Sequence, residues 1–303
     1  MTTTTAPLAP ARAPHTAPAV RRSVLQALRP ALQWRLLLLW LLALLLPALA
    51  AALPVWTWLG AAFDHTAGAA ALAQRLDLVA IADLVGLHTQ HASAVKAGGS
   101  ISLVMTLLLS PLLTGAAITA ARAPAPLGFA ELAAGGVREY GRLLRMLVWA
   151  IVPLGVAAFL GGMLASAADQ PDAVLESSAS NAALAAMLAG ALLLLLAHAT
   201  LDAGRAVLAL DRRRKSAVLA WRDGLGLLAR RPLAVFGLYA GITVAGLALA
   251  GTLAVARLNL PALGAGSFLG GLLLAQLAVL ALAWMRCARL FGLMELARGG
   301  GAR

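Results

Sequence analysis

Six long apolar runs constrain this chain more than any other feature of its sequence. An α-helix needs about 20 apolar residues to cross the roughly 30 Å hydrocarbon core of a bilayer, and each run is about that long. The runs cover residues 36–59, 101–121, 146–166, 182–204, 233–256 and 265–285. They lack the alternation that is typical of barrel strands. The sequence therefore predicts an all-α, polytopic membrane helix bundle with six transmembrane helices.

The composition argues against a soluble globular protein. Hydrophobic residues make up 61% of the chain and charged residues only 12%, whereas soluble domains average about 45–50% and about 25%. The net charge of +12 raises the question of nucleic acid. No connection between the spans is long enough for a recognition domain, so we expect no nucleic-acid partner.

Positive charges are distributed unevenly between the two sides of the predicted membrane. Of the 24 Lys and Arg residues, 21 fall on one side, and only Arg75, Lys96 and Arg257 fall on the other. Cytoplasmic loops carry such an excess, so we expect both termini in the cytoplasm. The first apolar run exceeds the roughly 7–15 residues of a signal-peptide core, which favours a retained span.

The spans also predict the domain organisation. Residues 1–20, rich in Thr, Ala and Pro, predict a disordered cytoplasmic tail. Residues 21–299 are expected to form one six-helix membrane domain, followed by a flexible C-terminus at 300–303. Between the first two spans, residues 75–90 have apolar positions at helical spacing. They predict an amphipathic helix on the outer membrane surface or against the bundle.

A short internal repeat lies in the loops. "VREYGRLL" at 137–144 and "WRDGLGLL" at 221–228 share an Arg-acid pair and a closing Leu-Leu. The second, fourth and sixth spans end near Arg122, Arg205 and Arg289, at nearly constant spacing. We interpret the pattern as three parallel hairpin repeats, each with an interfacial amphipathic helix, a span out and a span back. Chance similarity among Leu-, Ala- and Arg-rich segments is the alternative. The units would cover residues 21–122, 126–205 and 210–289.

The segment "RRRKSAVLAWRDGLGLLARRP", residues 212–232, is the most basic part of the chain. Its apolar positions recur at helical spacing. They are Val218, Trp221, Leu225 and Leu228. A helix of this kind lies in the membrane interface with its basic residues among lipid phosphates, so anionic lipid headgroups are the expected partners. The candidate lipid-facing residues are Arg212, Arg213, Arg214, Lys215 and Arg222.

One constellation of ionisable residues lies within the spans. His198, Asp202 and Arg205 share one face of the fourth span. Such groups are functional candidates because burying them in a membrane is costly. Arg122, Arg286, Arg289 and Glu295 should lie at similar depth. The cluster predicts either a functional site for an anionic headgroup or a proton, or an ion-pair ring between the repeats.

The remaining motifs do not indicate catalysis. His88 and His91, with Asp83 upstream, are too few for a zinc site. The sequence has no GxSxG, HExxH or P-loop motif. We therefore expect no enzyme, no catalytic residue, no cofactor and no metal.

Two segments carry a resemblance to known proteins. "AVLAWRDGLGLLARRPLAVFGLYAG" (217–241) and "GFAELAAGGVREYGRLLRMLVW" (128–149) resemble a broad group of bacterial six-span integral membrane proteins of unknown function. They are loosely similar to the membrane domain associated with some glycerophosphodiester phosphodiesterases. The resemblance implies a six-helix domain in the bacterial inner (cytoplasmic) membrane. It does not imply the hydrolase, whose His-Arg-Gly opening and metal-binding carboxylates are missing from this sequence.

The expected function follows from these features. The first hypothesis is a non-enzymatic scaffold or accessory subunit that contacts lipid headgroups, a protein partner or further copies of itself. The alternative is a transporter or permease subunit for a hydrophobic or lipid-like substrate. Transporters are often built with broken spans at corresponding positions of each repeat. Pro111 lies early in the second span and has no equivalent in the fourth or sixth, which favours the first hypothesis.

Overall fold

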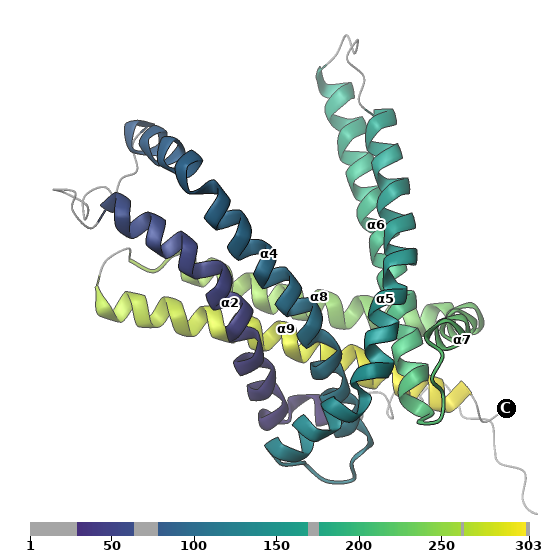
Figure 1. The fold of residues 1–303 in the computed structure, drawn as a ribbon. Helices are drawn as coiled ribbons and strands as arrows, with labels where there is room; N and C mark the ends of the chain where they lie inside the picture. The colour runs from purple at the N-terminus through teal and green to yellow at the C-terminus, as the bar shows by residue number, and fades with distance from the viewer. Residues whose placement is uncertain (1–28, 64–77, 169–175, 262–263, 301–303) are drawn as a thin grey trace, which may run out of the picture.

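The computed structural model describes residues 29–63, 78–168, 176–261 and 264–300, which consist almost entirely of helices (Figure 1). The elements are η1 (Arg29–Leu32), α2 (Trp34–Phe63), α4 (Leu78–Arg122), α5 (Phe129–Ala168), α6 (Glu176–Leu210), α7 (Ala217–Arg230), α8 (Pro232–Leu258) and α9 (Ala265–Gly300). Six of them are long and apolar enough to cross a membrane. The predicted all-α polytopic architecture is confirmed. The predicted tail at 1–20 lies outside the described residues.

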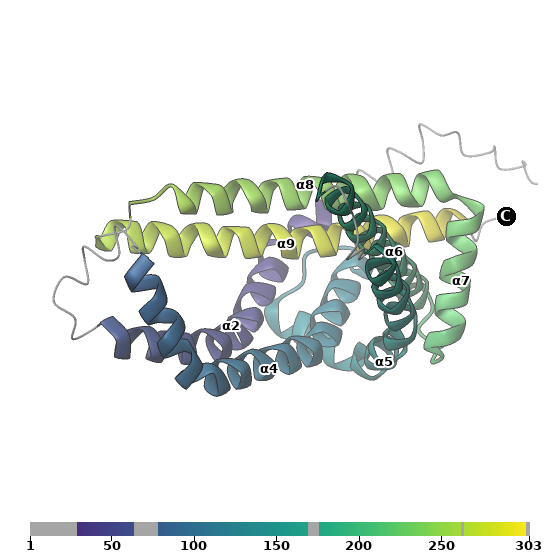
Figure 2. The same ribbon diagram turned by 90° about the horizontal axis from the view of Figure 1, so that it is seen from above.

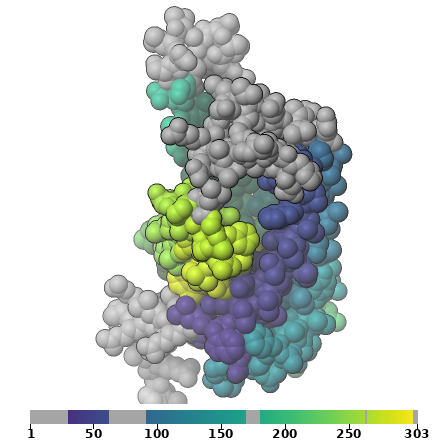
Figure 3. Space-filling view, turned by 90° about the vertical axis from the view of Figure 1, so that its left-hand side faces the viewer, coloured from purple at the N-terminus to yellow at the C-terminus, as the bar shows by residue number. Residues whose placement is uncertain are grey.

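The six long helices form three antiparallel hairpins: α2 with α4, α5 with α6, and α8 with α9. The hairpins converge at one end of the molecule and diverge toward the other (Figures 1 and 2). The short helix α7 lies at the converging end, against α5, α6 and α8. Figure 3 shows α2 between α9 and α4 on one face of the molecule. Each predicted repeat unit therefore contains one hairpin.

The hydrophobic core lies where the hairpins converge. Its fully buried side chains include Leu36, Met146 and Leu293, from three different hairpins. Toward the diverging ends, large apolar side chains such as Phe159 and Leu273 are exposed. Lipid tails are as apolar as these side chains, so such surfaces suit a bilayer. The converging end is thus the part of the molecule where helices from all three hairpins can build a shared site.

Two of the predicted interfacial helices are continuous with spans. Residues 137–144 form part of α5, and residues 78–90 of the predicted 75–90 helix form the start of α4. In the third unit, Pro232 separates α7 from α8, because proline has no N–H and suits the first turn of a new helix. The position 84 residues earlier holds Val148, which permits an unbroken helix.

Helix α7 is the amphipathic helix predicted in the basic segment, but the face that it buries coincides only in part with the predicted stripe. Its buried residues are Ala217, Ala220, Gly224, Leu227 and Leu228. Val218, part of the predicted stripe, is 44% exposed. The cause is a close crossing of α7 and α6, at which a Cβ on Gly224 would lie 2.8 Å from the Cα of Gly204. Small residues allow the two helices to approach this closely, and Leu227 and Leu228 are buried on the same face.

The crossing makes a prediction about stability. Gly224→Ala is expected to lower the free energy of unfolding by about 1–3 kcal/mol, because the new methyl group would meet the α6 backbone. Gly226→Ala is the matched control, because a Cβ there meets nothing within 4 Å. It is expected to be neutral or to stabilise by up to about 1 kcal/mol, since Ala favours helix. Thermal unfolding in one detergent measures both, and equal melting temperatures would contradict the close crossing.

Candidate functional site

A cluster of polar side chains joins α6, α8 and α9 at the converging end, with Asp202 at its centre. Asp202 Oδ1 accepts a hydrogen bond from Arg205 Nη1 at 2.7 Å. Asp202 Oδ2 lies 3.4 Å from Arg289 Nη2 and 3.5 Å from His198 Nδ1. The structure therefore brings together four of the five side chains that the sequence predicted to share a site.

Tyr239 and Thr243 of α8 complete the cluster. The Tyr239 hydroxyl accepts from Arg289 Nη1 at 3.1 Å and lies 3.0 Å from His198 Nδ1. Arg289 Nη1 also donates to Thr243 Oγ1 at 3.3 Å, and its guanidinium lies over the Tyr239 ring, 4.6 Å from the centroid. Neither α8 residue was predicted from the sequence. Their spacing places them on one helix face, but no sequence signal indicated that this face meets α6 and α9.

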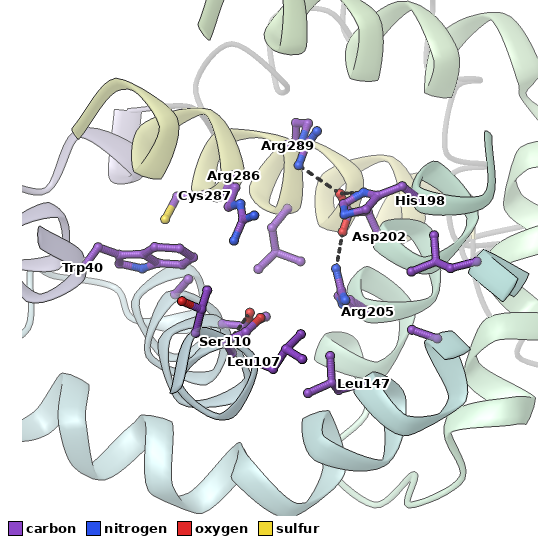
Figure 4. A pocket seen from close by; sticks show the side chains of 16 residues that line it. Trp40, Leu107, Ser110, Leu147, His198, Asp202, Arg205, Arg286, Cys287 and Arg289 are labelled. Atoms are coloured by element: carbon purple, nitrogen blue, oxygen red, sulfur yellow. Dashed lines mark hydrogen bonds and ion pairs between the residues drawn. The ribbon is translucent and has the colours of Figure 1, made fainter. Parts of the chain in front are cut away.

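The α6 and α9 residues of this cluster form one wall of a cavity of about 200 Å³ (Figure 4). The other walls come from α2, α4 and α5 and include Trp40, Leu107 and Leu147. One side of the cavity is therefore charged and the other largely apolar. Such a cavity suits a small polar group that is attached to an apolar chain or that lies among apolar groups.

Arg286 is the cavity residue whose charge is least neutralised. Figure 4 shows its guanidinium directed into the cavity from α9. It makes no hydrogen bond or ion pair with another residue of the described ranges, although Asp202, Arg205 and Arg289 act on it electrostatically. Three guanidinium groups and a single carboxylate thus line the cavity.

Hydrogen-bond donors also outnumber acceptors around the cavity. Among the described residues, Arg289 Nε and Trp40 Nε1 are buried without a hydrogen-bond partner. The hydroxyls of Thr106 and Thr114 donate to backbone carbonyls one turn earlier in α4. The cavity accordingly favours an anion, because arginine pairs with carboxylate and phosphate through several parallel N–H donors.

Arg122, the fifth predicted residue, belongs to a separate cluster. Glu139 accepts from Arg122 Nη1 and from Arg142 Nη1, each at 2.6 Å. Arg122 Nε donates to Ala209 O at 2.8 Å, and Arg142 Nη2 donates to Leu208 O at 2.7 Å. These carbonyls end α6, where backbone acceptors have no partner within the helix. This second cluster, which we call the Glu139 cluster, caps α6 and ties it to α4 and α5.

The predicted lipid-facing basic segment precedes and begins α7. Four of its residues are exposed, and they are Arg212, Arg213, Lys215 and Arg222. Arg214 differs, because its guanidinium pairs with Asp223 and its carbonyl accepts from Arg142 Nε at 2.9 Å. This pairing leaves four of the five predicted residues available on the surface.

Metal binding has no structural support within the described part of the chain, where no three His, Cys, Asp or Glu side chains form a group that could hold a metal ion. Asp83 and His88 lie outside the residues whose side chains are described.

Comparisons with protein-family models, curated proteins and solved structures gave no match. The fold and the six apolar helices define an all-α polytopic membrane protein.

Proposed function

We propose that this chain is a multi-pass protein of the bacterial inner membrane that binds the anionic headgroup of a membrane lipid. In this role it acts as a non-enzymatic scaffold or accessory subunit. The observation that carries the proposal is the excess of guanidinium groups over carboxylates in the cavity, with Arg286 directed into it. Arg289 is buried, Arg205 is half-buried and Arg286 is exposed. An anionic ligand would compensate this excess of positive charge through charge-assisted hydrogen bonds.

The position of the cavity along α9 supports a headgroup as the ligand. Arg286 follows Ala265, the first residue of α9, by 21 positions. At about 1.5 Å per residue this corresponds to about 32 Å, close to the roughly 30 Å hydrocarbon thickness of a bilayer. A span that enters the membrane near Ala265 therefore carries Arg286 to the opposite interface, where lipid phosphates lie.

The distribution of basic residues supports a cytoplasmic location for this interface. Lys96 lies toward the diverging end of α4, and Arg257 lies at the diverging end of α8. The arginines of both clusters and the exposed basic segment before α7 lie at the converging end. By the positive-inside rule, the converging end and both termini would be cytoplasmic.

The state of two hydroxyl groups that line the cavity favours ligand binding over catalysis. The Thr106 and Thr114 hydroxyls are occupied by backbone carbonyls, so neither is paired with a base that would activate it. The transporter alternative receives less support, because each of the six apolar helices is continuous, including α4 with Pro111 inside it. Transporter sites commonly use interrupted helices.

Arg205→Ala tests the proposal. The wild-type protein, purified in a mild detergent, is expected to retain an anionic lipid that mass spectrometry detects. Arg205→Ala should reduce the retained amount on the order of 10-fold, since a charge-assisted hydrogen bond contributes about 1.5–3 kcal/mol. Arg222→Ala, which removes an exposed arginine outside the cavity, is the control and should retain the lipid.

Two results would contradict the proposal. One is equal lipid retention by wild type and Arg205→Ala. The other is a wild-type protein that carries no lipid and co-purifies with a stoichiometric protein partner, which would favour a scaffold that acts through protein contacts. Flux of a lipid-like substrate in vesicles that hold the purified protein would favour the transporter.

A further inference from the structure

We infer that the cavity binds a dianionic phosphomonoester, carried by a lipid or present as free phosphate, and that Arg286 contacts it. This inference rests on the proposed function and specifies the chemical class of the ligand. It does not extend to the exposed basic segment before α7, which would attract any anionic lipid surface.

The net charge of the side chains that line the cavity favours one of the two common forms of lipid phosphate over the other. Arg205, Arg286 and Arg289 contribute three positive charges and Asp202 contributes one negative charge. A phosphodiester headgroup with one negative charge would leave part of this excess uncompensated. A phosphomonoester above its second pKa carries about two negative charges and would compensate it fully.

The three arginines differ in how firmly the protein holds them. Arg289 is fixed by Tyr239, Thr243 and Asp202, and Arg205 is fixed by Asp202. Arg286 has no such partner among the described residues and reaches into the cavity (Figure 4). Two guanidinium groups are therefore held in place, and the third is available to an incoming anion. A terminal phosphate has three strong acceptor oxygens, which suits several arginine donors at once.

The size and walls of the cavity favour a small headgroup. Its volume of about 200 Å³ is below the roughly 300–1,000 Å³ of pockets that enclose a drug-sized molecule. The wall opposite the arginines includes Leu107, Leu147 and Leu154. A phosphate that carries an apolar tail would place its charge against α9 and its first apolar groups against α4 and α5. Free phosphate would use the charged wall alone.

Because Arg286 has no partner among the described residues, its replacement can change ligand binding without lowering the stability of the fold. Asp202 and Arg289 are each tied to two or more side chains, so their replacement would disturb the fold. Arg286→Gln removes one of three like charges and breaks no hydrogen bond with the described residues. Its melting temperature in ligand-free detergent should be unchanged or slightly higher than that of the wild type. A loss of binding in this variant can then be attributed to the ligand contact.

The test uses two lipids with identical acyl chains, phosphatidic acid as the monoester and phosphatidylglycerol as the diester. Delipidated full-length protein is offered both at equal concentration at pH 8, above the second pKa of about 6 of a phosphomonoester, and bound lipid is counted by native mass spectrometry. The wild type should retain phosphatidic acid on the order of 10-fold over phosphatidylglycerol. Arg286→Gln should lose most of this preference, and Arg222→Gln should keep it.

The outcomes separate this inference from the proposed function. Equal retention of both lipids by the wild type, with loss of both in Arg205→Ala, would overturn the phosphomonoester and leave the headgroup site standing. Retention of neither lipid and no binding of inorganic phosphate would overturn both. Displacement of phosphatidic acid by millimolar inorganic phosphate would support the phosphomonoester site and would indicate that its ligand is free phosphate. Resistance to that displacement would support the lipid.

Discussion

Asp202→Asn is expected to lower the free energy of unfolding by about 3–5 kcal/mol, the typical cost of removing one partner from a buried ion pair. Asp202 is buried and is the only carboxylate in contact with Arg205 and Arg289 among the described residues. Its loss leaves the three guanidinium groups that line the cavity without a carboxylate among them. Thermal unfolding in detergent, followed by tryptophan fluorescence, should show a drop of several degrees in the melting temperature.

Asp223→Asn is the matched control for this experiment. Asp223 also pairs with an arginine, Arg214, but its side chain is 51% exposed. Exposed pairs typically contribute about 0.2–1 kcal/mol, so this variant should unfold close to the wild type. Phosphatidic acid should restore part of the stability lost in Asp202→Asn, because it supplies the missing negative charge. Equal stability of the two variants would show that Asp202 does not hold α6 to α9.

Glu139→Gln is expected to destabilise the protein by a similar amount, about 3–5 kcal/mol. The Glu139 carboxylate neutralises both Arg122 and Arg142, and all three side chains are at most 14% exposed. The amide would leave two charged groups without a counter-ion and loosen the cap on the α6 carbonyls. This variant should nevertheless keep its preference for phosphatidic acid at a temperature where it is folded, because none of the three residues lines the cavity.

Glu295→Gln provides the control for the Glu139 cluster. Glu295 pairs with Arg298 one helical turn away, and Arg298 is 45% exposed. A pair of this kind within one helix typically contributes about 0.3–0.5 kcal/mol. If the two glutamate variants unfolded at the same temperature, the Glu139 cluster would not be a structural tie between α4, α5 and α6.

The fold could be predicted well because membrane-spanning helices have a strong sequence signal. All six apolar runs lie within long helices, since a bilayer leaves backbone groups no partner outside the helix. The helix boundaries were less predictable. The difference between an unbroken α5 and a separate α7 depends on one residue, Pro232, in two segments that otherwise look alike. Which face of α7 is buried depends on the close contact between Gly224 and Gly204, and the periodicity of the apolar residues does not reveal this contact.

The site was only partly predictable, because sequence spacing reports neighbours on one helix and not contacts between helices. His198, Asp202 and Arg205 could be grouped because they share a face of α6. Arg289 was grouped with them through the repeat, which places it near the same membrane depth. The same reasoning wrongly grouped Arg122, which meets α6 at Ala209 and not at Asp202, and which pairs with Glu139 of α5.

Arg286 shows what spacing alone could not reveal. In the sequence it is one more basic residue at a cytoplasmic span end, like Arg298. In the structure it is directed into the cavity, and no hydrogen bond or ion pair with the described residues accounts for its charge. The absence of such a pairing, together with the arginines on either side, carries the functional argument.

The most direct test of the headgroup site is a structure determined in a lipid mesophase that contains phosphatidic acid. The proposal predicts density for a phosphate in the cavity, with oxygens about 2.7–2.9 Å from the guanidinium nitrogens of Arg286 and at least one of Arg205 and Arg289. A cavity without this density, in which Arg286 turns to pair with Asp202, would contradict it.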